Sequence, residues 1–89
     1  VKLTLSPEIQ TALHEGQAVV ALESTVITHG LPRPQNLELA LALEAVVRNT
    51  GAVPATIAVL SGDIVVGLNS QQMDLLANTK VDKASLWNL

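Results

Sequence analysis

Residues 35–60 read QNLELALALEAVVRNTGAVPATIAVL, a helix-forming segment followed by a strand-forming one. The leucines in its first half alternate as in a strand, but alanine and glutamate, which favour helices, stand between them and the segment is long. We therefore predict a helix over 35–50 that Gly51 ends. The run at 55–60 is apolar and short, which is typical of a buried strand.

A further helix and strand are predicted before this segment. Ser6 can cap the free amides of a helix, and Pro7 already has a helical φ angle. Gly16 ends that helix, and AVVAL at 18–22 indicates another buried strand. The following residues prolong this strand or leave it, and GLPRP at 30–34 is a loop.

After residue 60 the pattern predicts a hairpin and a short helix. Ser61-Gly62-Asp63 separates the strand from a second apolar run at 64–68. Asn69 or Ser70 caps a helix through Ala77, and residues 83–89 look like the start of another helix. We therefore expect an α/β chain, a partial α-β-α layered fold with a mixed sheet, a β-α-β crossover and a β-hairpin. We expect residues 1–89 to form part of a single domain that is incomplete at the carboxyl end.

Composition excludes several classes of partner. The chain has 89 residues, 48% of them hydrophobic, which suits one small globular unit. Its formal charge is -3 and its five basic residues are scattered, so we expect no nucleic-acid partner. No apolar run approaches the roughly 20 residues of a membrane span, and no secretory signal is evident. Without cysteine, thiolate metal sites are excluded, and we expect a cytoplasmic protein with no membrane partner.

Glu23 is the most informative single residue. It follows the apolar run at 18–22, where a parallel strand would deliver its carboxyl end to a cleft. A carboxyl sheltered by apolar neighbours has a raised pKa, and near neutrality it can pass protons in either direction. A structural carboxylate, hydrogen-bonded to loop amides or paired with a lysine, explains the same position equally well. From the residues alone both interpretations stay open.

Other polar residues offer weaker signals. Thr25 and His29 lie close to Glu23 with further hydroxyls, and such a group could hold a polyol or a phosphate. Threonine is also ordinary at strand ends, and a single histidine is more often structural. Lys83 could meet an anionic substrate as a point charge, but it fits an exposed lysine in a polar turn as well. The sequence has no glycine-rich nucleotide loop, no histidine pair at metal spacing and no nucleophile elbow.

Two blocks of sequence resemble a known family. Residues 20–32, VALESTVITHGLP, with PQN at 34–36, closely resemble the opening signature of pseudouridine-5'-phosphate glycosidases. A second block, GAVPATIA at 51–58 with GL at 67–68, matches the family's next segment at the expected distance. Few families share anything similar. The chain therefore resembles the amino-terminal part of this family.

The resemblance implies an enzyme that reversibly splits pseudouridine 5'-phosphate into uracil and ribose 5-phosphate. Such glycosidases or lyases of nucleotide catabolism break a carbon–carbon bond with help from a divalent metal, typically manganese, and assemble as trimers. Glu23 matches the family's catalytic proton donor and acceptor, and Lys83 matches a substrate-binding lysine. We add His29 and Thr25 as substrate-binding candidates. The family's imine-forming lysine and metal-holding aspartate lie beyond the matched stretch, so we expect no metal ligand in this chain.

The match after Lys83 is partial. The family continues from this lysine as lysine-x-serine-arginine-arginine-aspartate-leucine, whereas this chain reads KASLWNL at 83–89. Leucine, tryptophan and asparagine thus replace two arginines and an aspartate. A second hypothesis is therefore a non-catalytic α/β binding or assembly module derived from the family. Under the enzyme hypothesis, we expect the 89-residue piece to be inactive alone.

Overall fold

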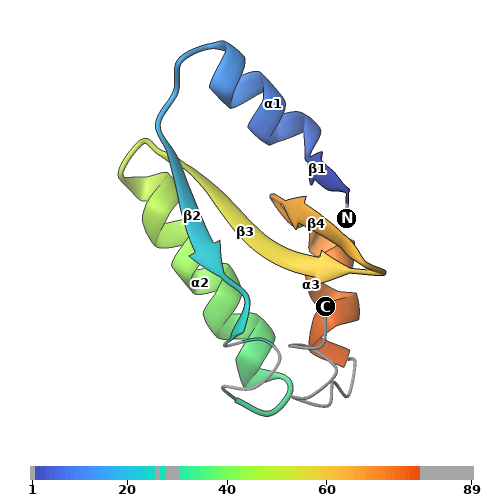
Figure 1. Ribbon diagram of the computed structural model, residues 1–89. Helices are drawn as coiled ribbons and strands as arrows, with labels where there is room; N and C mark the ends of the chain where they lie inside the picture. The colour runs from blue at the N-terminus through green and yellow to red at the C-terminus, as the bar shows by residue number, and fades with distance from the viewer. Residues whose placement is uncertain (1, 26, 28–30, 79–89) are drawn as a thin grey trace.

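The strands of this chain form one mixed sheet, and the helices pack on it. The computed structural model describes residues 2–25, 27 and 31–78, and within them the sheet has the strand order β1-β4-β3-β2 (Figure 1). The strands are β1 (Leu3–Leu5), β2 (Val19–Glu23), β3 (Val53–Leu60) and β4 (Asp63–Val66), and the helices are α1 (Pro7–His14), α2 (Gln35–Asn49) and α3 (Ser70–Asn78). The predicted α/β class is therefore confirmed.

Strand pairing follows the predicted connections. β2 and β3 pair in parallel, with Ala21 opposite Ala55, and α2 connects them as the predicted β-α-β crossover. β3 then turns back and pairs antiparallel with β4, which is the predicted β-hairpin. No sequence pattern predicts β1, which pairs in parallel with β4, because its three residues are too few to give a periodic signal.

Local signals set the ends of these elements where the sequence predicts them. Ser61 and Gly62 connect β3 to β4 with φ angles of 51° and 81°, the positive values of a two-residue type I′ turn. Ser6 caps α1 through its side-chain oxygen. At the start of α3, Asn69 Oδ1 accepts a hydrogen bond from Gln72 N at 2.7 Å, and Gln72 Oε1 accepts one from Asn69 N at 2.9 Å.

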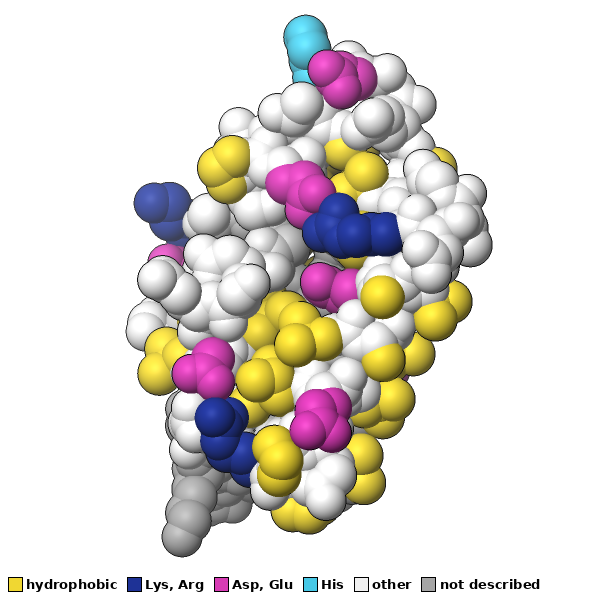
Figure 2. Space-filling view, turned by 180° about the vertical axis from the view of Figure 1, so that it is seen from behind, with side chains coloured by type: hydrophobic (Ala, Val, Ile, Leu, Met, Phe, Trp, Pro, Cys, Tyr) yellow, Lys and Arg dark blue, Asp and Glu magenta, His cyan; other side chains and the backbone are white. Residues whose placement is uncertain are grey.

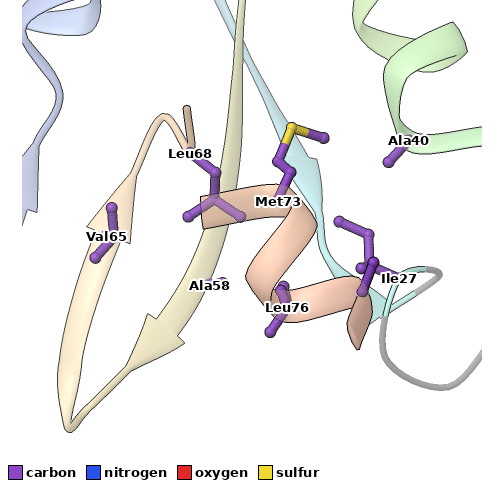
Figure 3. Packing of buried hydrophobic residues seen from close by; sticks show 8 residues of the cluster. Ile27, Ala40, Ala58, Val65, Leu68, Met73 and Leu76 are labelled. Carbon is purple, nitrogen blue, oxygen red and sulfur yellow. The ribbon is translucent and has the colours of Figure 1, made fainter. Parts of the chain in front are cut away.

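The main core lies between the sheet and the helices α2 and α3, and it includes the residue that follows the turn after β2. Figure 3 shows the side chains of Met73 and Leu76, on α3, beside Ile27. Ile27 and Met73 are 2% and 1% exposed. The whole cluster is Ile27, Ala40, Ala58, Val65, Leu68, Met73, Leu76 and Ala77. Because burial of one large apolar side chain contributes about 1.5–3 kcal/mol, the core holds the chain firmly just beyond β2.

The prediction of a buried strand at 18–22 is wrong in one respect. In the described part of the chain, β2 is at the edge of the sheet, and Val20, Ala21 and Glu23 are exposed. The run predicted at 55–60 belongs to an interior strand, because β3 has a neighbour on each side and none of its residues is exposed. Both runs are short and apolar, so composition alone does not separate an interior strand from an edge strand.

α2 carries apolar side chains on its outer side as well as on its inner side. Ala40 is buried against the core, whereas Leu39, Leu43 and Val46 are 39%, 40% and 62% exposed. The spacing of these three residues places them on one side of the helix. Figure 2 shows hydrophobic side chains gathered on this face of the molecule. The helix therefore presents an apolar stripe, Leu39, Leu43 and Val46, which the described residues leave uncovered.

Candidate functional site

The carboxyl end of β2 presents Glu23. This residue is the last of the strand and pairs with Ile57 of the parallel neighbour β3. Because ligands of open α/β sheets bind beyond the carboxyl ends of the strands, the position agrees with the prediction. The expected burial of its carboxyl group is not observed, because the described residues leave the Glu23 side chain exposed. Glu23 forms no ion pair with a described residue either.

The structure brings together two of the four predicted site residues. Thr25 is exposed and lies in the turn directly after β2, two residues past Glu23. A hydrogen bond from Ile27 N to Ser24 O, at 2.9 Å, closes that turn. A carboxyl and a hydroxyl group therefore share one strand exit. His29 and Lys83 lie outside the described residues, so their roles stay predictions.

Asn36 joins this region and is a residue that sequence reasoning missed. Its side chain is 3% exposed, although it belongs to a polar residue near the start of α2. Its Nδ2 donates to the carbonyl oxygens of Ile27 at 2.8 Å and Ala77 at 3.3 Å. The sequence carries no direct signal for this role, because an asparagine beside Pro34 in a loop-to-helix junction is ordinary on a protein surface.

Two exposed ion pairs connect the helices to other elements of the fold. Arg33 Nη2 lies 3.2 Å from Asp74 Oδ1 and connects the loop before α2 to α3. Arg48 binds both carboxylate oxygens of Glu8, at 2.8 and 3.1 Å, and connects α2 to α1. These hydrogen bonds hold the pKa of Glu8 below its usual value and raise the pKa of Arg48. Exposed pairs contribute roughly 0–1 kcal/mol each, so they orient the helices more than they stabilise them.

Two kinds of feature are missing from the described part of the chain. No group of three or more His, Asp or Glu residues in it is placed to hold a metal ion. We assign no reaction step to the divalent metal that the resemblance implies. None of the helices at 2–25 or 31–78 has the length and apolar content that crossing a bilayer requires.

Comparison with known proteins identifies relatives along nearly the whole chain. The sequence profile of the indigoidine synthase A-like protein family matches residues 8–89. The pseudouridine-5'-phosphate glycosidase of Deinococcus radiodurans is 54% identical over 88 residues, which are 98% of this chain and 28% of that protein.

Two solved structures share the fold. The prealnumycin C-glycosynthase AlnA, in complex with ribulose 5-phosphate, has a TM-score of 0.70 and 44% identity, covering 89% of this chain and 25% of its own. The indigoidine synthase A-like protein of Thermotoga maritima has a TM-score of 0.73 and 30% identity, covering 92% of this chain and 26% of its own.

These matches include both blocks that carry the sequence resemblance, and Glu23 lies within them. They confirm the expected kinship with the pseudouridine-5'-phosphate glycosidases. The chain spans about a quarter of the length of the relatives and structures compared. On the match of its sequence over residues 8–89, the chain belongs to the indigoidine synthase A-like protein family.

Proposed function

We propose that this chain is the amino-terminal part of a pseudouridine-5'-phosphate glycosidase and that Glu23 is its general acid and base. The enzyme would reversibly cleave the carbon–carbon glycosidic bond of pseudouridine 5'-phosphate to give uracil and ribose 5-phosphate. The observation that carries the proposal is the position of Glu23, at the carboxyl end of a parallel strand and inside the block shared with the family. The 54% identical relative bears the name of this activity.

The proposed chemistry needs a positioned carboxyl group. When the bond between uracil C5 and ribose C1' breaks, the bonding electrons stay on C5, and the carboxylic acid of Glu23 gives C5 its proton. In the reverse direction, the carboxylate removes that proton. The lysine that the resemblance implies as an imine-forming electron sink lies outside this chain, as do the ligands of the manganese ion.

Substrate contacts are assigned by sequence. Lys83 is proposed to bind the substrate, and His29 and Thr25 are proposed to contribute an imidazole and a hydroxyl near the strand exit. The phosphate-bearing ligand in the AlnA structure supports a sugar phosphate as the class of ligand. A homotrimer in the cytoplasm completes the proposal, with a small-molecule nucleotide as the substrate and no nucleic-acid partner.

Two surfaces support the view that more of the enzyme surrounds this chain. β2 has a free edge in the described residues, and exposed strand edges readily accept another strand. The apolar stripe of α2 is uncovered in the same residues. Elements beyond the matched quarter of the family's length would cover these surfaces and shelter Glu23.

Substitution of Glu23 tests the proposal in the full-length protein. We expect Glu23→Gln to reduce uracil release from pseudouridine 5'-phosphate by about 10²–10⁴-fold, the usual contribution of a general acid. Glu38→Gln is the matched control, because Glu38 is an exposed glutamate in the first turn of α2. In D₂O, the wild type should place deuterium on C5 of the released uracil. Full turnover by Glu23→Gln would remove this residue from the mechanism.

The alternative function is a non-catalytic binding or assembly module of the same family. The departure from the family motif at 86–88 favours it. A source reading frame that continues past Leu89 into the family's lysine and aspartate motifs would favour the enzyme. Tight binding of ribose 5-phosphate by a full-length protein that releases no uracil would favour the module.

A further inference from the structure

Asn36 connects the exit of β2 to the end of α3 from inside the core. We infer that it is a positioning residue, which holds the strand exit that carries Glu23 in the geometry of proton transfer. The inference deepens the proposed function and rests on it.

The side-chain amide of Asn36 makes three hydrogen bonds, and all three are to backbone groups. Nδ2 donates to Ile27 O at 2.8 Å and to Ala77 O at 3.3 Å, and Oδ1 accepts from Leu37 N at 2.8 Å. Leu37 N is in the first turn of α2 and Ala77 O is in the last turn of α3. Such groups have no partner within their own helix, so Asn36 pairs one free amide and one free carbonyl.

The amide is buried, which makes these bonds costly to lose. Asn36 is 3% exposed and lies next to the apolar cluster that contains Ile27 and Ala77. A buried carbonyl left without a partner costs about 1–3 kcal/mol. An asparagine side chain supplies two donors and one acceptor, whereas an aspartate of the same shape supplies no donor. The site therefore requires an amide and not merely a polar group of this size.

The chain path from Asn36 to Glu23 is short. Ile27 O accepts from Asn36, and Ile27 N donates to Ser24 O at 2.9 Å, so both backbone groups of Ile27 are held. Ser24 directly follows Glu23, the last residue of β2. β2 itself has a neighbour on one side only among the described residues. Two features therefore hold Glu23 in place: the pairing of β2 with β3 and the turn that Asn36 anchors.

This support matters for rate because proton transfer to carbon needs a near-attack geometry. A displacement of about 1 Å at the reacting group costs about 10²-fold in rate. If Asn36 releases Ile27 and Ala77, the strand exit and the end of α3 can shift relative to each other. We therefore expect its loss to lower kcat while the affinity for the substrate phosphate changes little.

The experiment compares Asn36→Asp with wild type in the full-length enzyme. The variant keeps the shape of the side chain but cannot donate to Ile27 O or Ala77 O. We expect kcat for uracil release to fall by about 10–100-fold with a KM change of less than about threefold. Hydrogen exchange in the native state should quicken at Ile27 and in the last turn of α3, and this readout does not depend on activity.

Thr56→Val is the matched control for lost stability. Thr56 is 2% exposed, and its hydroxyl donates to Glu44 Oε2 of α2 at 2.6 Å, so the variant also breaks a partly buried hydrogen bond between elements. It removes no backbone group that pairs β3 with β2 and no hydrogen bond of Asn36. We expect a lowered unfolding midpoint with kcat, measured per folded molecule, unchanged.

Each outcome tests the positioning role of Asn36 separately from the proposed function. If wild type is active and Asn36→Asp lowers kcat no more than Thr56→Val, the positioning role is overturned. If exchange at Ile27 is unchanged, the mechanical link is overturned even when activity falls. If wild type releases no uracil, the proposed function fails and the catalytic part of the inference fails with it, while faster exchange would still identify Asn36 as a structural anchor.

Discussion

Replacing Gly67 with alanine tests how closely α1 lies against the end of β4. Gly67 has a φ angle of 92°, and a Cβ atom built on it would lie 2.5 Å from Ser6 Oγ and 2.6 Å from Ile9 Cγ1. The positive φ angle costs an alanine about 1–2 kcal/mol, and overpacking adds about 1–3 kcal/mol. The lower entropy of the unfolded chain returns about 0.4–1 kcal/mol. We therefore expect Gly67→Ala to destabilise the fold by about 1–4.5 kcal/mol.

Gly51→Ala separates the two causes of this loss. Gly51 has a nearly equal φ angle of 89°, but a Cβ atom built there meets no atom within 4 Å. Gly51→Ala should therefore lower the stability of the fold only through the positive φ angle, by about 1 kcal/mol. Urea unfolding of the full-length protein, followed by circular dichroism, measures both variants. Equal losses for Gly67→Ala and Gly51→Ala would refute the close packing of α1.

Two further predictions concern charge and completeness. Glu8→Gln should destabilise the protein by roughly 0.2–1 kcal/mol at pH 7. Because Arg48 lowers the pKa of Glu8, this difference is present above the ordinary carboxyl pKa and should vanish as the pH falls through the lowered pKa. Urea unfolding of wild type and Glu8→Gln at about pH 7 and at successively lower pH would detect this loss. The 89-residue chain alone should release no uracil from pseudouridine 5'-phosphate, and metal-dependent turnover by it would contradict our assignment of the missing lysine and metal ligands.

Local chemistry explains which parts of the fold the sequence predicts. The sequence predicts helix α2 because the segment is long and contains alanines and glutamates, although its leucines alternate as in a strand. Ser61-Gly62 predicts the hairpin, because few residues adopt the two positive φ angles of a tight turn. The cap at Ser6 is equally local. Each of these features depends on a few neighbouring residues, so each is visible in the sequence.

Features that depend on distant residues were not predictable in the same way. β1 exists because β4 offers its edge, and its three residues carry no pattern of their own. The edge position of β2 depends on which strands lie beside it, and an apolar run of five residues carries no information about that. The burial of Asn36 depends on Ile27 and Ala77, nine and 41 positions away in the sequence.

The same distinction applies to Glu23. The strand that ends at this residue is local, and the sequence predicts its position at the strand exit correctly. Shelter from water is not local, because it requires atoms from other elements that cover the carboxyl group beyond the end of β2. A general acid that protonates carbon works best where water is excluded. The described residues therefore supply the placement of the proposed acid, through β3 and Asn36, and they leave its side chain exposed to water.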